Sequence, residues 1–175
     1  MRLGEPKQLV VLGGETLIER AVRVAREAGC APVVVVLGAA YVEILAHNAL
    51  GDAVPVINDE WQEGMASSIR LGVRTLGFIA KDAEGVLLMA CDQPAVTVEH
   101  LCRVLMKQEV KASRYAGRNG VPAYFPKKYF GELMSLKGDT GARDLLAQAR
   151  FEELAHGELD IDTAEDVARA RELFG

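Results

Sequence analysis

Aspartate side chains stand where two apolar segments are expected to end. Asp92 follows the apolar run "GVLLMAC" directly, and Gln93-Pro94 then turns the chain. Asp160 and Asp162 are two residues apart in "LDIDTAED", so on a short strand both would point to one face. Carboxylate oxygens suit a hard divalent cation such as Mg²⁺, so one of this pair could share the cation with Asp92. The alternative is that these aspartates belong to ordinary loops and helix caps.

The opening stretch "MRLGEPKQLVVLGG" places basic side chains beside glycines. Lys7 follows Pro6, which restricts the local backbone and directs the lysine side chain. A lysine near a glycine-bearing loop often contacts a phosphate as a point charge. Arg2, two residues before Gly4, could do the same. The alternative is a pair of solvated surface cations.

Small and basic residues recur in three further segments. "EGMASSIRLG" begins a helix with Gly64, Ser67 and Ser68, and a helix N-terminus presents free N–H groups to a ligand. Small residues at this place also suit tight helix packing. "GRNGVPAYF" and "LKGDTGARDLL" contain Arg118 and Arg143, whose guanidinium groups could bind phosphate. Both segments could equally be turns before the next element.

Length and composition limit the class of protein. The 175 residues predict one domain, 1–175, of soluble composition. A net charge of −5 without a basic stripe argues against a nucleic-acid partner. The absence of both a long apolar run and a signal peptide argues against a membrane protein and favours a cytoplasmic location. Three cysteines without a CxxC pair indicate reduced thiols rather than disulfides or zinc ligands.

Hydrophobic periodicity predicts an alternation of strands and helices. The expected helices are 16–29, 39–50, 64–77, 97–108, 128–136, 141–149 and 163–174, with Thr97 and Thr163 as N-caps. The expected strands are 32–38, 53–58, 85–92, 110–117, 121–125, 151–156 and 159–162. This alternation is typical of parallel βαβ units in a doubly wound α/β sheet, where sites lie at the carboxyl ends of strands.

Six motifs occur in an order that resembles a known family. They are "RLGEPKQL", "EGMASSIRLG", "LLMACDQPAVT", "GRNGVPAYF", "KGDTGARDLL" and "DIDTAEDVARA". Together they resemble the MobA/MocA-like NTP transferases of molybdenum cofactor synthesis, most closely the cytidylyltransferase branch, from Arg2 to Phe174. The resemblance implies a Rossmann-like, three-layer α/β fold of the nucleotide-diphospho-sugar-transferase type, with a mostly parallel central sheet. It implies Mg²⁺-dependent transfer of CMP from CTP to the terminal phosphate of molybdopterin, and it leaves CTP against GTP open.

The resemblance also implies roles for individual residues. It implies catalytic roles for Lys7, Asp92 and Asp162, and Mg²⁺ ligands among Asp92, Asp160 and Asp162. The residues that it assigns to the nucleotide are Arg2, Gly4, Lys7, Gly64, Ser67, Ser68 and Asp92. The residues that it assigns to the acceptor are Arg118, Gly120, Asp139 and Arg143.

Family members begin with a strand and a loop of the form LAAGxSxRxGxxKxL, and this chain resembles them only from Arg2 onward. We therefore expect about ten preceding residues, the first strand and the phosphate-binding glycines, to be missing through a misassigned or trimmed start.

Three alternative functions remain open. The chain could transfer a nucleotide to another phosphorylated acceptor. It could be a non-catalytic relative that binds a nucleotide or a partner such as a molybdenum hydroxylase. It could be an oxidoreductase, although no GxGxxG follows a strand.

Overall fold

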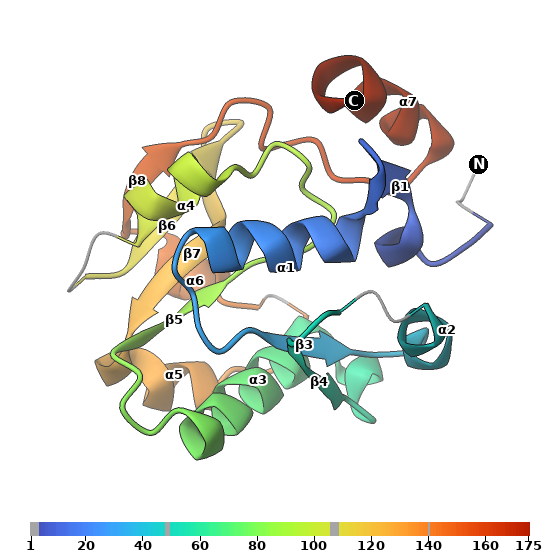
Figure 1. The fold of residues 1–175 in the computed structure, drawn as a ribbon. Coiled ribbons are helices and arrows are strands. Elements are labelled where there is room, and N and C mark those ends of the chain that lie inside the picture. Colours follow the sequence, from blue (N-terminus) through green and yellow to red (C-terminus); the bar gives the residue numbers. More distant parts are fainter. Residues whose placement is uncertain (1–3, 48–49, 106–108, 140) are drawn as a thin grey trace.

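Strands and helices alternate along most of the chain, as the sequence predicts (Figure 1). The computed structural model describes residues 4–47, 50–105, 109–139 and 141–175. The helices are α1 (Leu17–Glu27), α2 (Tyr41–Ala46), α3 (Met65–Ile79), α4 (Val98–Val104), α5 (Phe130–Met134), α6 (Arg143–Leu146) and α7 (Ala164–Phe174), with the 3-10 turns η1 (Lys7–Leu9), η2 (Trp61–Glu63) and η3 (Lys127–Tyr129). The strands are β1 (Val11–Leu12), β2 (Glu15–Thr16), β3 (Val34–Leu37), β4 (Val54–Ile57), β5 (Gly85–Leu88), β6 (Lys111–Tyr115), β7 (Arg118–Pro126) and β8 (Arg150–Glu153).

The larger strands form two separate sheets rather than one mostly parallel sheet. β3 and β4 make a parallel pair, and the second sheet has the order β5-β7-β6-β8. β7 is antiparallel to both of its neighbours, whereas β6 and β8 are parallel. The tight turn between β6 and β7 explains the mixture. Ala116 and Gly117 both have positive φ, 47° and 75°, which is the geometry of a two-residue hairpin and forces antiparallel pairing.

Both faces of the four-stranded sheet are covered by helices. Along β5, Val86 and Leu88 pack in a cluster with side chains of α3 and α5. Leu87 points the other way and packs with Val24 of α1 and Leu101 of α4. Successive side chains of a strand point to opposite faces, so β5 is sandwiched between two helical layers. The predicted three-layer α/β fold is therefore confirmed.

Helix α1 connects several parts of the core. Thr16 and Glu19 form a capping box that fixes where the helix begins. Ile18 packs in the cluster that contains β3, Leu17 packs beside α7, and Val24 packs beside α4. Figure 1 shows α1 lying across the middle of the molecule.

Thr97 and Thr163 are the N-caps of α4 and α7, as predicted. The predicted helix 39–50 is shorter than expected, since α2 covers only Tyr41–Ala46.

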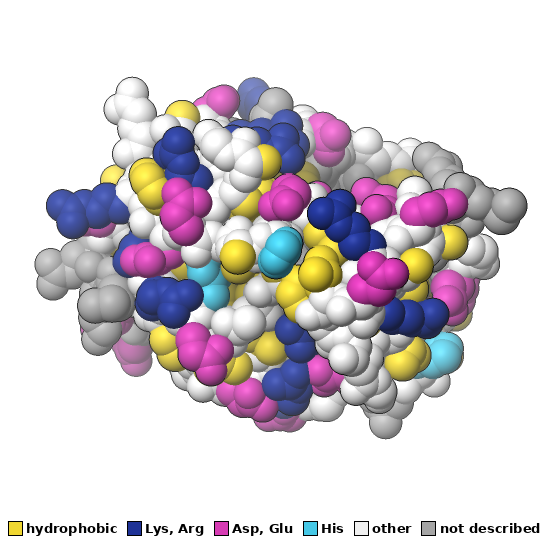
Figure 2. Space-filling model, turned by 90° about the horizontal axis from the view of Figure 1, so that it is seen from above, with side chains coloured by type: hydrophobic (Ala, Val, Ile, Leu, Met, Phe, Trp, Pro, Cys, Tyr) yellow, Lys and Arg dark blue, Asp and Glu magenta, His cyan; other side chains and the backbone are white. Residues whose placement is uncertain are grey.

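The surface seen in Figure 2 carries acidic and basic side chains that alternate over short distances, with apolar side chains between them. In the part of the chain that the structure describes, no helix combines the length and the apolar character that crossing a bilayer requires.

A buried polar network joins α4 to the four-stranded sheet. The Ser113 hydroxyl donates to the Pro122 carbonyl over 2.7 Å, so it must accept the 2.7 Å hydrogen bond that joins it to His100 Nε2. His100 is therefore the Nε2–H tautomer. Its Nδ1 is buried and, within the described residues, has no hydrogen-bond partner. Burial, assisted by the charge of Arg103, lowers the pKa of His100.

We predict that His100 makes the protein less stable as the pH falls below about 6.5. Because the folded state lowers the pKa of His100, the unfolded state binds the proton first, and stability is lost below the unfolded pKa of about 6.5. The loss approaches about 1.4 kcal/mol per pH unit until the folded pKa is reached. Urea unfolding at several pH values measures it. His100→Gln should flatten this slope, whereas His156→Gln, at an exposed position, should keep it. An unchanged slope in His100→Gln would contradict the prediction.

Candidate active site

A lysine ammonium group lies between two carboxylates from distant parts of the chain. Lys7 Nζ donates to Asp92 Oδ2 over 2.5 Å and to Asp162 Oδ1 over 2.9 Å. The Asp92 side chain is 15% exposed and that of Asp162 is 65% exposed, so the group is reached from the Asp162 side. Burial alone would lower the pKa of Lys7, but the hydrogen bonds to both aspartates and their charges raise it above its usual value. Lys7 is therefore firmly protonated.

The backbone brings the two aspartates together. Asp92 lies in the turn that follows β5, and its carbonyl accepts a 2.9 Å hydrogen bond from the Ile161 N–H. Leu159 and Ile161 are buried while Asp160 and Asp162 are exposed, so both aspartates point outward as predicted. The expected strand 159–162 is not formed, because this single bond replaces a regular ladder.

The site fits a divalent cation through two carboxylates rather than three. Mg²⁺ prefers oxygen ligands, keeps several waters and usually takes one or two carboxylates together with substrate phosphates. Asp92 and Asp162 already share a cation in the form of the Lys7 ammonium group. No cluster of three or more His, Cys, Asp or Glu side chains suited to a metal occurs within the described ranges. Of the two aspartates predicted as alternative partners of Asp92, Asp162 is the one that shares the Lys7 ammonium group with it. Their role as metal ligands stays a prediction.

The Asp160 carboxyl is influenced by the charges of this centre. Partial desolvation of the Asp160 carboxyl, followed by repulsion from Asp92 and Asp162, raises its pKa. The charges of Lys7 and Arg118 partly offset this rise. The role of Arg118 in acceptor binding stays a prediction.

Gly120, another predicted acceptor residue, makes room for Tyr115. A Cβ atom at Gly120 would collide with the Tyr115 hydroxyl oxygen. That hydroxyl accepts a 3.2 Å hydrogen bond from Gln93 Nε2, which also donates to the Gly157 carbonyl over 3.2 Å. Gln93 is buried next to Asp92, so this contact holds the turn that carries the aspartate.

The start of α3 is tied to the loop that carries Asp139. Gly64 has φ 111° and ψ −172°, and a Cβ there would lie 2.8 Å from the Asp139 Cα. The Met65 N–H donates to Asp139 Oδ1 over 3.4 Å, and the Ala66 N–H donates to the Gly138 carbonyl over 3.1 Å. The first amide groups of α3, predicted to be free for a ligand, are therefore bonded within the chain.

Asn58 organises the two serines of α3, and the sequence did not single it out. It is 4% exposed and directly follows β4. Asn58 Nδ2 donates to Ser67 Oγ over 2.8 Å and to Ser68 Oγ over 3.0 Å. The available signal was its position, since a polar residue at the carboxyl end of a parallel strand faces the site region of an α/β sheet.

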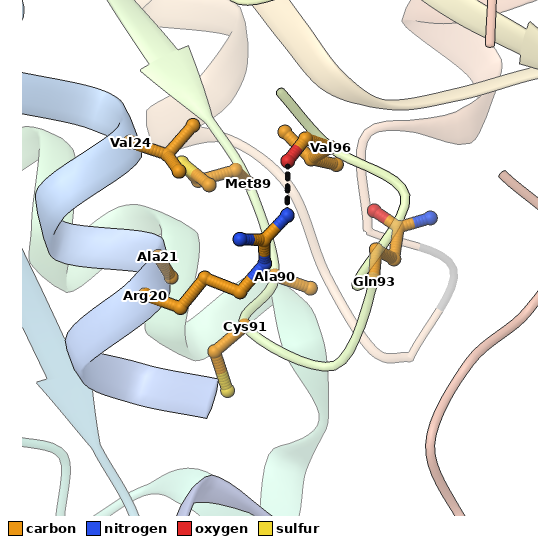
Figure 3. A pocket seen from close by; sticks show the side chains of 8 residues that line it. All are labelled: Arg20, Ala21, Val24, Met89, Ala90, Cys91, Gln93 and Val96. Atoms are coloured by element: carbon orange, nitrogen blue, oxygen red, sulfur yellow. Dashed lines mark hydrogen bonds between the residues drawn. The ribbon is translucent and has the colours of Figure 1, made fainter. Parts of the chain in front are cut away.

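Arg20 of α1 supports the turn after β5 and was also missed. Its Nη2 donates to the carbonyls of Pro94 and Val96 over 2.8 and 3.2 Å. Figure 3 shows its guanidinium group reaching from the helix to this turn, beside a small pocket that Cys91 and Gln93 also line. Burial raises the pKa of the Cys91 thiol to about 12, so this thiol is not a ready nucleophile. An arginine on the otherwise apolar face of a helix was the signal in the sequence.

The remaining predicted residues are exposed or lie outside the described residues. Arg2 falls outside the described residues. Gly4 is exposed, and a Cβ there would meet no atom within 4 Å. Arg143 is exposed at the start of α6. The roles of these residues stay predictions.

Comparisons with known proteins identify the family of the chain. The family model for the MobA-like NTP transferase domain matches residues 1–154. The purine catabolism protein PucB of Bacillus subtilis (strain 168) is 29% identical over 97% of this chain and 90% of its own length. The nicotine blue oxidoreductase of Paenarthrobacter nicotinovorans is 30% identical over 99% of this chain and 89% of its own length.

Two solved structures of one protein have a similar fold. Rv0371c from Mycobacterium tuberculosis H37Rv superposes with a TM-score of 0.81 and is 32% identical, covering 98% of this chain and 91% of its own. The manganese complex of Rv0371c superposes with a TM-score of 0.77 and 31% identity, over 97% of this chain and 93% of its own.

We predict that Arg20→Ala destabilises the protein by about 1–3 kcal/mol, because it leaves two carbonyls of the turn without a donor. The free energy of unfolding in urea measures the loss. Arg23→Ala is the matched control, since Arg23 lies on the same helix and bonds the surface carboxylates of Glu15 and Glu27. It should cost about 1 kcal/mol at most. Equal losses of unfolding free energy in the two variants would contradict the prediction that the Arg20 hydrogen bonds stabilise the protein more than the surface contacts of Arg23 do.

Proposed function

Because the chain belongs to the MobA-like NTP transferase family, we propose that it transfers CMP from CTP to the terminal phosphate of a molybdopterin-type acceptor and releases pyrophosphate. The observation that carries nucleotidyl transfer is the Lys7 ammonium group held between Asp92 and Asp162. The choice of acceptor is supported by the motif "KGDTGARDLL", and CTP is chosen because the chain as a whole resembles the cytidylyltransferase branch. A molybdenum hydroxylase that receives the product stays a prediction.

The reaction needs charge stabilisation more than acid–base chemistry. A phosphate oxygen of the acceptor is already anionic at neutral pH, so it attacks the α-phosphorus without a general base. A bond forms between that oxygen and the α-phosphorus, and the bond from the α-phosphorus to the bridging oxygen breaks. Pyrophosphate leaves with the electron pair. Catalysis then depends on in-line positioning and on cations around the phosphates.

Lys7, Asp92 and Asp162 divide these tasks in the proposal. The Lys7 ammonium group turns from the carboxylates to the nucleotide phosphates and binds them as a point charge. Asp92 and Asp162 are then free to hold a divalent cation by carboxylate oxygens. Such a cation, when bound, neutralises charge on the α-phosphate and the leaving pyrophosphate. The manganese complex of Rv0371c supports a divalent cation, and we propose Mg²⁺ for this chain.

The acceptor side of the proposal uses Arg118. Its guanidinium group, at the first residue of β7, can bind a phosphate with two parallel hydrogen bonds. Asp139 and Gly120 support the acceptor side indirectly. Asp139 accepts a hydrogen bond from the start of α3, and Gly120 leaves room for Tyr115. Arg143 completes the proposed acceptor side as a second anion contact.

We predict that Asp92→Asn lowers kcat by about 100- to 1000-fold, since it removes one of the two carboxylates that hold the cation. The measurement is pyrophosphate release from CTP with Mg²⁺ and a molybdopterin acceptor. Asp82→Asn, in an exposed turn before β5, is the matched control and should retain full turnover. Near-normal turnover of Asp92→Asn would exclude Asp92 as a metal ligand.

We also predict a nucleotide-specific rise in thermal stability. CTP with Mg²⁺ at about 100 times its Kd should stabilise the folded state by about 2.7 kcal/mol. For a domain of this size that raises Tm by about 5–10 °C. GTP with Mg²⁺, Mg²⁺ alone and NADH are the comparison ligands. A rise with NADH alone would favour the oxidoreductase alternative. One relative is named as an oxidoreductase. A rise with GTP but not CTP would overturn the choice of nucleotide.

A further inference from the structure

We propose that the Lys7 side chain controls the access of a divalent cation to Asp92 and Asp162. The lysine competes with the cation, so the chain binds the cation tightly only when a phosphate ligand has drawn the ammonium group away. Triphosphate and cation then bind cooperatively, and neither binds well alone. The inference rests on the proposed nucleotidyl transfer and describes how the same site is regulated.

The Lys7 ammonium group occupies the place between the two carboxylates. Its Nζ lies 2.5 Å from Asp92 Oδ2 and 2.9 Å from Asp162 Oδ1. Mg²⁺ lies about 2.1 Å from its oxygen ligands, so an ion on the same two oxygens would take nearly the position of Nζ. Two positive charges cannot share that position, because they repel each other and need the same lone pairs. The ammonium group must therefore leave before a divalent cation can use these two oxygens.

The lysine side chain is the part of this contact that can move. The Asp92 carbonyl accepts a 2.9 Å hydrogen bond from the Ile161 N–H, which ties the two segments that carry the carboxylates to each other. The Lys7 backbone is anchored as well, because its carbonyl accepts a 3.1 Å hydrogen bond from the Val10 N–H. The Lys7 side chain is 33% exposed and has a flexible four-carbon stem, so it can turn away while the backbone stays in place.

A phosphate ligand makes this turn favourable. If Lys7 moved into water alone, Asp92 and Asp162 would face each other without a compensating charge. The Asp92 side chain is only 15% exposed, so water would replace the lost ammonium group poorly. A triphosphate offers oxygens to the ammonium group, and a divalent cation can then replace it between the carboxylates. Each ligand therefore raises the affinity for the other, and by the same factor.

The first test removes the lysine and uses Mn²⁺ as the only ligand. Lys7→Met keeps a side chain of similar length but removes the charge. The Kd of Mn²⁺, measured by electron paramagnetic resonance of the free ion, should fall about tenfold or more. The reason is that the apparent affinity of the wild-type chain is reduced by the fraction of molecules in which the ammonium group has left.

Lys111→Met is the matched control for this test. Lys111 Nζ also pairs with a carboxylate, that of Glu152 at 2.5 Å, and its loss changes the net charge by the same amount. Its substitution should leave the Kd of Mn²⁺ unchanged. An equal gain of Mn²⁺ affinity in the two variants would show a general effect of net charge and would overturn the inference.

The second test removes a carboxylate and uses no metal. In Asp92→Asn the Lys7 ammonium group keeps only the Asp162 carboxylate, so it is released more easily. The Kd of inorganic tripolyphosphate, measured by calorimetry in EDTA, should fall about fivefold or more, although the same variant weakens the cation site. Glu153→Gln is the matched control, because it removes an exposed carboxylate that lies 3.8 Å from Arg114. It should leave this Kd unchanged.

The outcomes separate this inference from the proposed function. If the wild-type chain binds CTP with Mg²⁺ but Lys7→Met binds Mn²⁺ no more tightly than the wild type, the inference is wrong and the proposed function stands. If Lys7→Met does not fold, Asp92→Asn decides, and an unchanged Kd of metal-free tripolyphosphate overturns the inference. If the wild-type chain binds neither CTP nor tripolyphosphate with Mg²⁺, both are overturned. Tighter Mn²⁺ binding in Lys7→Met and tighter metal-free tripolyphosphate binding in Asp92→Asn support the inference.

Discussion

Two carboxylates that share one cation are the constraint on which the site depends. Asp92 and Asp162 lie within hydrogen-bond distance of the same nitrogen, and without a positive charge between them they would repel each other. Lys7 supplies that charge from a segment that precedes both aspartates by 85 and 155 residues. The contact therefore joins η1, the turn after β5 and the segment before α7. It also shows that this position accommodates a positive charge, here an ammonium group.

Buried and partly buried polar side chains hold the loops around Asp92 and the start of α3 in place. Arg20 holds the turn after β5 by two carbonyls, and Gln93 ties the same turn to Tyr115. Asn58 ties the end of β4 to the first turn of α3 by donating to Ser67 and Ser68. Arg20, Gln93 and Asn58 each donate two hydrogen bonds, so they fix the orientation of the segment as well as its position.

The sequence predicted the elements better than their pairing. Residue types and turn-forming neighbours pointed to Lys7, Asp92 and Asp162, because charged side chains beside Pro6 or Pro94 are typical of strand ends and loops. The antiparallel course of β7 was not predicted, since Ala116-Gly117 is not a strong hairpin signal. Arg20 and Asn58 were missed for another reason. Their positions on a helix face and at a strand end were signals, but their partners are carbonyls and hydroxyls whose places depend on the folded chain, so the sequence does not say what they bond.

Because the two sheets are separate, helix α1 helps to hold them in place relative to each other. β3–β4 and the four-stranded sheet share no hydrogen-bonded strand pair within the described residues, and α1 packs against both through Ile18 and Val24. Asn58 and Ser68 lie at the end of the first sheet, whereas Asp92 follows β5 of the second. Helix α3 also connects the two sheets, because Gly72 lies against Val36 of β3 while Val73 packs in the cluster that contains β5. A ligand that contacted both sheets would therefore stabilise their relative position.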